Sequence, residues 1–349
     1  MAEKWQIVKE VQYDNFMDFY QEIFLNNVEM ENKRCPEFRD VADYVYRGES
    51  NSEYSLKPRI LRNSSENSKK KHDAFIKEAG SLMEFYERCN YHGLDIPKIN
   101  DFENYSILKV NNIDEFVQHF DYTWIPPQIS HFVCLAQHYG IPTRMLDWTF
   151  DIKVAAYFAS KKKLEKKADN FPDRYTIWAL DKKIIAGNNY VYNYLQQMHK
   201  TLRNGKTIDN WPLTFTIPLY CENPNINAQK GILTNWTIHT ENLETFSHQI
   251  EQDISLDQLL KEYAKDHNIS HRSCNIRKGE HVPSILYKFT FPYDTIGGTL
   301  LFLQKNDCLS GRVFPGYTGV VNEIDEYDII KSIGLHEDNY FSLKEVEII

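Results

Sequence analysis

Residues 135–159 read LAQHYGIPTRMLDWTFDIKVAAYFA, and this stretch decides the fold class of the chain. Its first part completes an apolar stripe that predicts a helix over residues 130–140, with Gly140 at a typical helix C-cap position. The apolar run 145–149 predicts a short buried strand. A second helix is predicted over 151–167, because its alanines suit close packing against a sheet and its lysines follow the helix dipole. A helix, a buried strand and a helix are therefore expected in succession.

The segments on either side of this stretch predict a mixture of helices and strands. Apolar residues at helical spacing predict further helices over 13–27, 72–89, 113–120, 255–266, 294–305 and 317–327. Alternating or continuous apolar runs predict strands over 43–50, 175–180, 212–220, 231–238 and 284–291. The predicted fold class is therefore α+β.

The composition is that of a globular protein: 349 residues, 42% hydrophobic and 14% aromatic, so many rings are expected in the core. The net charge of −9, from 40 basic and 49 acidic residues, argues against a broad basic surface for duplex nucleic acid. Six scattered cysteines favour reduced thiols. Because we find neither a membrane-length apolar run nor a signal-peptide core, we expect a cytoplasmic protein with no membrane partner.

Several common catalytic motifs are absent from the sequence, namely a Walker loop, GxGxxG, HExxH and GxSxG. No motif therefore supports assignment of the chain as a P-loop ATPase, kinase, Rossmann dehydrogenase, zincin or α/β-hydrolase. A similar face of the predicted helix carries three possible metal ligands, His131, Cys134 and His138, but the sequence shows no fourth ligand for them. We therefore expect no metal site.

Charged side chains interrupt the apolar block. A buried strand does not tolerate Arg144 and Asp147 without partners, because a stranded buried charge costs several kcal/mol. The two residues either satisfy each other and nearby backbone or line a cleft. His138 can be read as a structural histidine or as a base. Arg47, which directly precedes a glycine on a predicted strand, could grip a phosphate or ribose oxygen at two points.

Two motifs together resemble the FRG domain family. They are the strand Tyr46-Arg47-Gly48 and the run QHYGIPTRMLDWT (137–149), which leads into a helix ending in Tyr157-Phe158-Ala159. Weaker matches are Leu56, Pro58 and Arg62, then Ala228-Gln229-x-Gly231, and finally Val313-Phe314-Pro315-Gly316 with Gly319. The resemblance implies an FRG domain over residues 43–325. It leaves residues 1–42 as an N-terminal helical extension and 326–349 as a C-terminal segment packed on the core.

The order of these elements is similar to that of ADP-ribosyltransferases of the Arg-Ser-Glu type. This second resemblance implies an ADP-ribosyltransferase-like fold, a mixed β-sheet core flanked by helices, and NAD⁺ as a substrate. It implies that Arg47 holds the NAD⁺ phosphates or the ribose next to nicotinamide, and that Trp148 or Tyr139 stacks on the nicotinamide ring. The residues to which it gives a role in binding NAD⁺ are Tyr46, Arg47, Gly48, Tyr139, Thr143, Arg144 and Trp148.

The chain departs from the transferase pattern at three places. The second motif reads Asp-Trp-Thr in place of Ser-Thr-Ser, Gln229 stands where the superfamily carries its catalytic glutamate, and Asn225 stands where an arginine is expected. Because an amide cannot act as a carboxylate, the negative charge and the base fall to Asp147, His138 or Glu49. The candidate catalytic residues are Arg47, His138, Asp147 and Gln229.

The family setting implies a bacterial or phage-associated toxin or anti-phage defence effector that transfers ADP-ribose to a macromolecule. Nucleic acid is favoured over protein as the acceptor, and a single strand can be held by stacking on aromatic rings. An antitoxin protein is an implied partner. Three alternatives stay open: a non-catalytic module that binds a nucleotide or nucleic acid, a hydrolase or nuclease that uses His138 and Asp147, and a purely structural role for residues 137–149.

Overall fold

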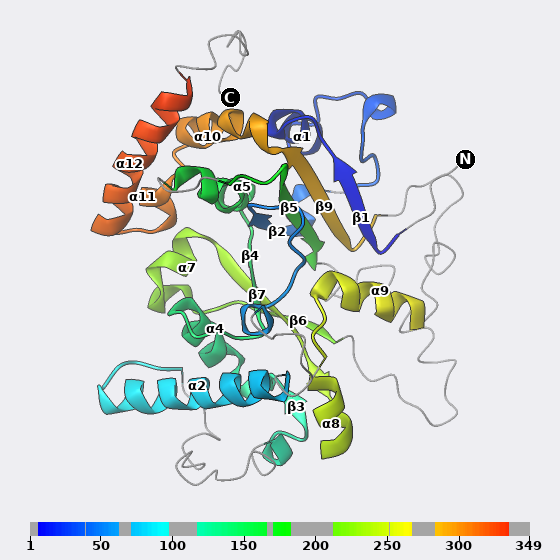
Figure 1. Ribbon diagram of the computed structural model, residues 1–349, viewed down its shortest axis with the longest axis vertical. Helices are drawn as coiled ribbons and strands as arrows, with labels where there is room; N and C mark the ends of the chain where they lie inside the picture. The colour runs from blue at the N-terminus through cyan, green and yellow to red at the C-terminus, as the bar shows by residue number, and fades with distance from the viewer. Residues whose placement is uncertain are drawn as a thin grey trace.

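The computed structural model describes residues 6–38, 40–62, 71–97, 117–165, 170–182, 212–250, 252–266 and 283–334. Helices surround a central β-sheet in these residues (Figure 1). The predicted α+β class is confirmed.

The central sheet has seven strands in the order β1-β9-β5-β2-β4-β7-β6. Their bounds are Val8–Gln12 (β1), Leu286–Pro292 (β9), Arg174–Asp181 (β5), Tyr44–Glu49 (β2), Leu146–Thr149 (β4), Gly231–Trp236 (β7) and Leu213–Thr216 (β6). The pair β1 and β9 is parallel, and the other neighbours are antiparallel, so the sheet is mixed. The interior strand β5 is buried along nearly its whole length, which suits its mostly apolar sequence.

An aromatic-rich core joins one face of the sheet to four helices: α1 (Phe16–Ile23), α5 (Ile152–Ser160), α10 (Ile296–Lys305) and α12 (Tyr317–Gly334). Asn15 caps α1 by accepting a hydrogen bond from the backbone of Asp18. The helix then buries Phe16 and Phe19 against Phe291 of β9. The expected ring-filled core is therefore observed on this face.

Two further layers complete the described fold. On the other face of the sheet, α9 (Leu256–Asp266) buries its apolar side against β-strand residues. A separate core joins α2 (Lys71–Tyr91), α4 (Ser130–His138) and α8 (Leu243–Ile250), which lie together at the lower end of Figure 1. The two-stranded sheet of β3 (Thr123–Trp124) and β8 (Ile238–His239) lies at this end as well. Two short helices, α7 (Pro224–Ala228) and α11 (Ser310–Val313), are followed directly by Gln229 and Phe314, which line the cavity described below.

The predicted helix, strand and helix of residues 130–167 are confirmed as α4, β4 and α5, although α5 gives way to a 3₁₀ turn over Lys161–Leu164. Gly140 has a φ of 100°, as its C-cap position requires. The predicted helix 113–120 is described only from residue 117 onward. The predicted strand 212–220 ends early, at Thr216, and α8 was not foreseen.

The ends of the predicted domains differ from what the structure shows. The segment read as a helical extension, residues 1–42, contains β1, which is an edge strand of the central sheet. Helix α12 runs through the predicted boundary at residue 325 and buries Ile330 in the core, while residues 335–349 lie outside the described part. None of the described helices is long and apolar enough to span a membrane.

Candidate active site

The central sheet opens between β2 and β4, and this opening forms the candidate site. The two strands are in register only at Tyr46 and Thr149, whereas β2 pairs with β5 along its whole length. Beyond that pair, Arg47 Nη1 donates a hydrogen bond of 2.8 Å to the main-chain oxygen of Asp147. The guanidinium therefore satisfies a strand carbonyl and stands at the point where the two strands separate.

Carboxylates hold the Arg47 guanidinium on two sides. Its Nε and Nη2 lie 2.9 and 2.8 Å from Glu49 Oε1, and its Nη1 lies 3.8 Å from Asp147 Oδ2. Burial lowers the pKa of Arg47, but the attraction of Glu49 and Asp147 outweighs it, so the pKa is raised and the group stays charged. Three of its five N–H groups have partners at hydrogen-bond distance in the described structure. The two others are available to a ligand.

Gly48 is explained by packing. A Cβ at this position would lie 1.8 Å from the main-chain oxygen of Ala155 and 2.6 Å from the main-chain nitrogen of Ala159. Helix α5 therefore approaches β2 as closely as backbone atoms allow, with alanines on the facing side. This contact fixes α5 over the strand that carries Arg47.

A chain of hydrogen bonds positions the Asp147 carboxylate. Thr143 Oγ1 donates to Gln137 Oε1, and Gln137 Nε2 donates to Asp147 Oδ1 at 2.7 Å. Asp147 itself is two-thirds exposed, so its charge faces an open space and not the core. Gln137 was not among the predicted site residues, although it opens the QHYG motif; its role depends on a contact that the sequence does not reveal.

His138 lies at the end of α4, beside the same opening. Burial lowers its pKa below the ordinary value of 6.5, and the Asp147 charge only partly opposes this effect. The imidazole is therefore neutral at neutral pH and has a ring nitrogen that can accept a proton.

Gln229 is at the C-cap of α7, directly before β7, and not on the strand itself. Its Nε2 donates to the main-chain oxygen of Val313 at 3.2 Å, and its own main-chain oxygen accepts a hydrogen bond from Thr149 Oγ1 at 2.6 Å. Gln229 thus ties the end of β4 to α11. Its amide nitrogen is occupied by this structural contact.

These groups surround one cavity of about 700 Å³, a volume in the usual range for small-molecule sites. The predicted residues that line it are Tyr46, Arg47, Gly48, Glu49, His138, Asp147, Trp148 and Gln229. Lining residues that were not among the predicted site residues include Tyr54, Arg59, Gln137, Lys161, Lys162 and Phe314. Trp148 is 3% exposed and its Nε1 donates to Thr234 Oγ1, so it is part of the cavity floor without offering an open ring face.

Three residues predicted to bind NAD⁺ do not line this cavity: Tyr139, Thr143 and Arg144. Tyr139 is largely exposed, and Thr143 is fully buried, where it orients Gln137. Arg144 is buried against α2, where its Nε and its backbone N–H both donate to the Glu78 carboxylate at 2.6 Å. The charge of Arg144 is therefore neutralised inside the fold and not in the cleft.

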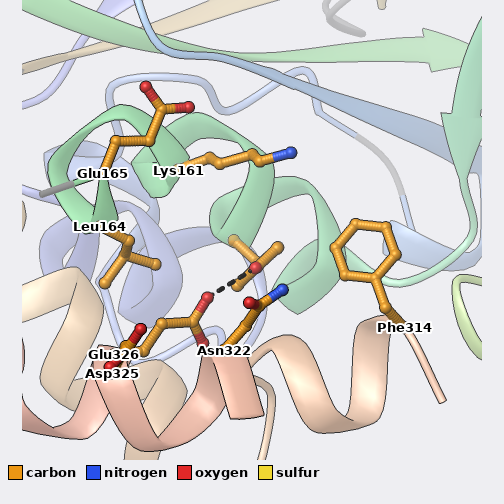
Figure 2. A pocket seen from close by; sticks show the side chains of 8 residues that line it. Lys161, Leu164, Glu165, Phe314, Asn322, Asp325 and Glu326 are labelled. Carbon is orange, nitrogen blue, oxygen red and sulfur yellow. Dashed lines mark hydrogen bonds between the residues drawn. The ribbon is translucent and has the colours of Figure 1, made fainter. Parts of the chain in front are cut away.

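A second cavity of about 460 Å³ adjoins the first (Figure 2). Lys161, Glu165 and Phe314 border both cavities, and Lys161 Nζ lies 5.6 Å from the centre of the Phe314 ring. The far wall is α12, from which Asn322 and Glu326 project. Glu326 accepts hydrogen bonds from the Tyr157 hydroxyl at 2.8 Å and from the backbone of Ser310 at 2.9 Å.

Within the described residues, no group of three or more His, Cys, Asp and Glu side chains is arranged to hold a metal ion. Cys134, which shares a helical face with His131 and His138, is fully buried with its sulfur 3.7 Å from that of Met145.

Comparison with known proteins places one part of the chain in a family. Residues 42–168 match the FRG domain family, so the chain carries an FRG domain there. The matched segment includes Arg47, His138 and Asp147 but ends before Gln229 and Phe314, and it is shorter than the predicted span of 43–325. No curated protein and no solved structure matches the chain.

Proposed function

We propose that the cavity binds NAD⁺ and that the protein is an ADP-ribosyltransferase. The observation that carries the proposal is the Asp147 carboxylate, which Gln137 holds 3.8 Å from Arg47 in a cavity of about 700 Å³. A fixed negative charge in a partly closed site stabilises the positive charge that develops on a ribosyl carbon.

Charge of opposite sign on different walls of the cavity supports NAD⁺ as the ligand. Glu49 and Asp147 come from β2 and β4, whereas Lys161 and Lys162 come from the 3₁₀ turn after α5. NAD⁺ has a cationic nicotinamide at one end and an anionic diphosphate near its middle. We place the nicotinamide riboside beside the carboxylates and the diphosphate beside the lysines, with the two available N–H groups of Arg47 on ribose oxygens.

The reaction follows from this placement. The bond between nicotinamide nitrogen and ribosyl carbon breaks, and its electron pair leaves with nicotinamide, which becomes neutral. The oxocarbenium-like carbon faces the Asp147 carboxylate. An acceptor hydroxyl or amine attacks that carbon, and His138 takes its proton because burial keeps the imidazole neutral. The chemistry requires no carboxylate at Gln229.

We propose a macromolecular acceptor, with single-stranded nucleic acid ahead of protein. Tyr54 is half exposed at the cavity, and Arg59 is exposed beside it. The Tyr54 ring could stack on a base, and the Arg59 cation could contact the phosphate backbone of the nucleic acid. In the cell, such an enzyme would act as a toxin or a defence effector, and a partner antitoxin would restrain it.

The direct test is incubation of the purified protein with adenylate-labelled NAD⁺ and, separately, cellular RNA, single-stranded DNA and lysate protein. Transfer of label to one pool, with release of nicotinamide, is the expected result. Release without transfer would reassign the protein as an NAD⁺ hydrolase. If NAD⁺ is intact in every mixture but binds with saturation, the proposal is wrong and the cavity belongs to a binding module. Product formation from nucleic acid without NAD⁺ would indicate a nuclease.

Replacing Asp147 with asparagine is expected to reduce nicotinamide release about 100-fold, because the shape and the acceptor oxygen remain while the negative charge is lost. The affinity for NAD⁺ should change much less, since the charge acts mainly on the transition state. Steady-state kinetics and NAD⁺ titration measure the two effects. Glu165→Gln is the matched control, because Glu165 borders the same cavity on another wall. An unchanged rate in Asp147→Asn would remove Asp147 from the mechanism.

The transfer rate is expected to fall on the acid side of a midpoint below pH 6.5. The neutral form of His138 accepts the proton, and burial lowers its pKa, so the rate should reach a plateau by neutral pH. His138→Gln should lose this acid limb and about 100-fold in rate. His131→Gln, an exposed histidine on the same helix, should retain both. An acid limb that persists in His138→Gln would assign the base to another residue.

A further inference from the structure

Helix α12 presents an uncovered apolar stripe. Its members are Tyr317, Val320, Val321, Ile324 and Tyr327, which we call the α12 stripe, with exposed fractions of 95, 52, 59, 59 and 40%. Scattered apolar residues are normal on a protein surface, but five on one face of one helix are not. Figure 1 shows α12 at the edge of the molecule, where a partner can reach it.

The spacing of the stripe suits contact with another helix. Residues 317, 320, 324 and 327 follow one another at intervals of three, four and three, which is the heptad spacing of helices that pack side by side. The opposite side of α12 is already engaged, because Ile330 is buried and Ile329 and Ile333 pack against the core. The helix therefore has one apolar face that packs on the core and a second one that is exposed in the part of the chain that the structure describes.

The charges around the stripe select the partner. Glu326 is buried and lines the second cavity together with Asp325, so neither faces the stripe. Glu323 and Asp328 flank the stripe, and the only basic residue of α12 is Lys331. Two parallel copies of the helix would bring Glu323 of one close to Asp328 of the other, because these are the g and e positions when Tyr317 is an a position. Anionic lipid would be repelled as well. A helix with apolar residues at heptad spacing and lysine or arginine beside them would match both the stripe and its charge.

We propose that the α12 stripe is a docking site for a basic amphipathic helix of a partner protein. The inference is independent of the reaction proposed for the cavity. The far side of α12 lines the second cavity through Asn322 and Glu326 (Figure 2), so a docked helix would lie on the element that forms the far wall of the cavity next to the candidate site.

The test uses a fluorescent three-heptad peptide with leucine at the a and d positions and arginine at e and g. We expect it to bind the full chain in an anisotropy titration, more weakly as salt is raised, and to lose at least about tenfold in affinity with Ile324→Asp. The matched control is Ile217→Asp, which changes an isoleucine of similar exposure (53%) outside α12 and should bind normally. A peptide with glutamate at e and g should not bind.

Four results would overturn the proposal. Equal binding of the arginine and glutamate peptides would show that charge does not select the partner. Binding that Ile324→Asp leaves unchanged, or no binding to the unmutated chain, would remove the stripe as the docking site. Sedimentation of the full chain as a dimer that Ile324→Asp converts to a monomer would assign the stripe to a second copy. Circular dichroism checks that the variant folds, as expected for a substitution at an exposed position.

Discussion

Replacing Arg47 with alanine is expected to reduce nicotinamide release and label transfer roughly 100- to 1,000-fold, the usual effect of removing a positioned donor from an active site. The variant loses the two N–H groups that we assign to NAD⁺, and it frees the Asp147 main-chain oxygen that Arg47 now satisfies. It also leaves Glu49, whose side chain is 11% exposed, without its closest cation. The site should therefore lose both its ligand contacts and part of its order.

Two controls separate these effects. Arg47→Lys keeps a positive charge near Glu49 but loses the planar fork, so it should fold normally and still be strongly impaired. Arg59→Ala removes an exposed arginine from the same cavity and should have a smaller effect. Thermal unfolding of each variant reports stability independently of turnover. An Arg47→Ala protein that is folded and as active as the unmutated chain would exclude the proposed NAD⁺ site.

The same variant tests the proposed cellular role. Expression of the unmutated chain should arrest bacterial growth, and Arg47→Ala should restore it. Normal growth with the unmutated chain at high expression would contradict the proposed toxin role. The transferase reaction would be tested separately by the labelled-NAD⁺ assay.

Replacing Gly48 with alanine is expected to lower the free energy of unfolding by about 3 kcal/mol or more. The added methyl group would lie 1.8 Å from the Ala155 main-chain oxygen, and backbone atoms of a packed helix cannot move aside as a flexible side chain can. Helix α5 would have to separate from β2, which would disturb the wall of the cavity as well as the core. Urea denaturation measures the loss.

Gly80→Ala is the matched control for this substitution. Gly80 is exposed on α2, and apart from its chain neighbours and the backbone of its own helix no atom lies within 4 Å of the position that its Cβ would occupy. Alanine there should stabilise the helix by about 0.5–1 kcal/mol, because it removes the entropic cost of glycine. A Gly48→Ala protein as stable as the unmutated chain would show that α5 does not press on β2 as described.

The central part of the fold was predictable because its signals are local. Gly140 and Pro142 end α4 by their own backbone preferences, and the alanines of α5 mark a helix that packs closely on a sheet. Strand β1 was missed because its sequence, VKEVQ, is mostly polar and has only one buried residue, Val11. Strand β1 forms because it pairs with β9, and a local sequence pattern cannot indicate a pairing partner that lies so far along the chain.

The candidate site was predictable only in part, for a similar reason. The sequence predicts that the charges of Arg144 and Asp147 either have partners or line a cleft. It does not indicate that Arg144 is the buried residue and Asp147 the one that faces the cleft. That choice depends on Glu78 of α2, a residue distant in sequence that neutralises Arg144. Gly48 was predicted to bind NAD⁺, but the structure shows the backbone of α5 packed against it, a contact that no local pattern predicts.

The pairing of β1 with β9 sets an order of events during protein synthesis. Val8 pairs with Leu286, 278 positions later, so at about 5–20 residues per second the first strand waits roughly 14–56 s for its neighbour to be translated. Throughout that time it leaves the ribosome with an unpaired edge, which a chaperone or a second nascent chain can contact. The cavity is likewise incomplete until Phe314 has been added, so any activity of the site begins only after translation has passed that residue.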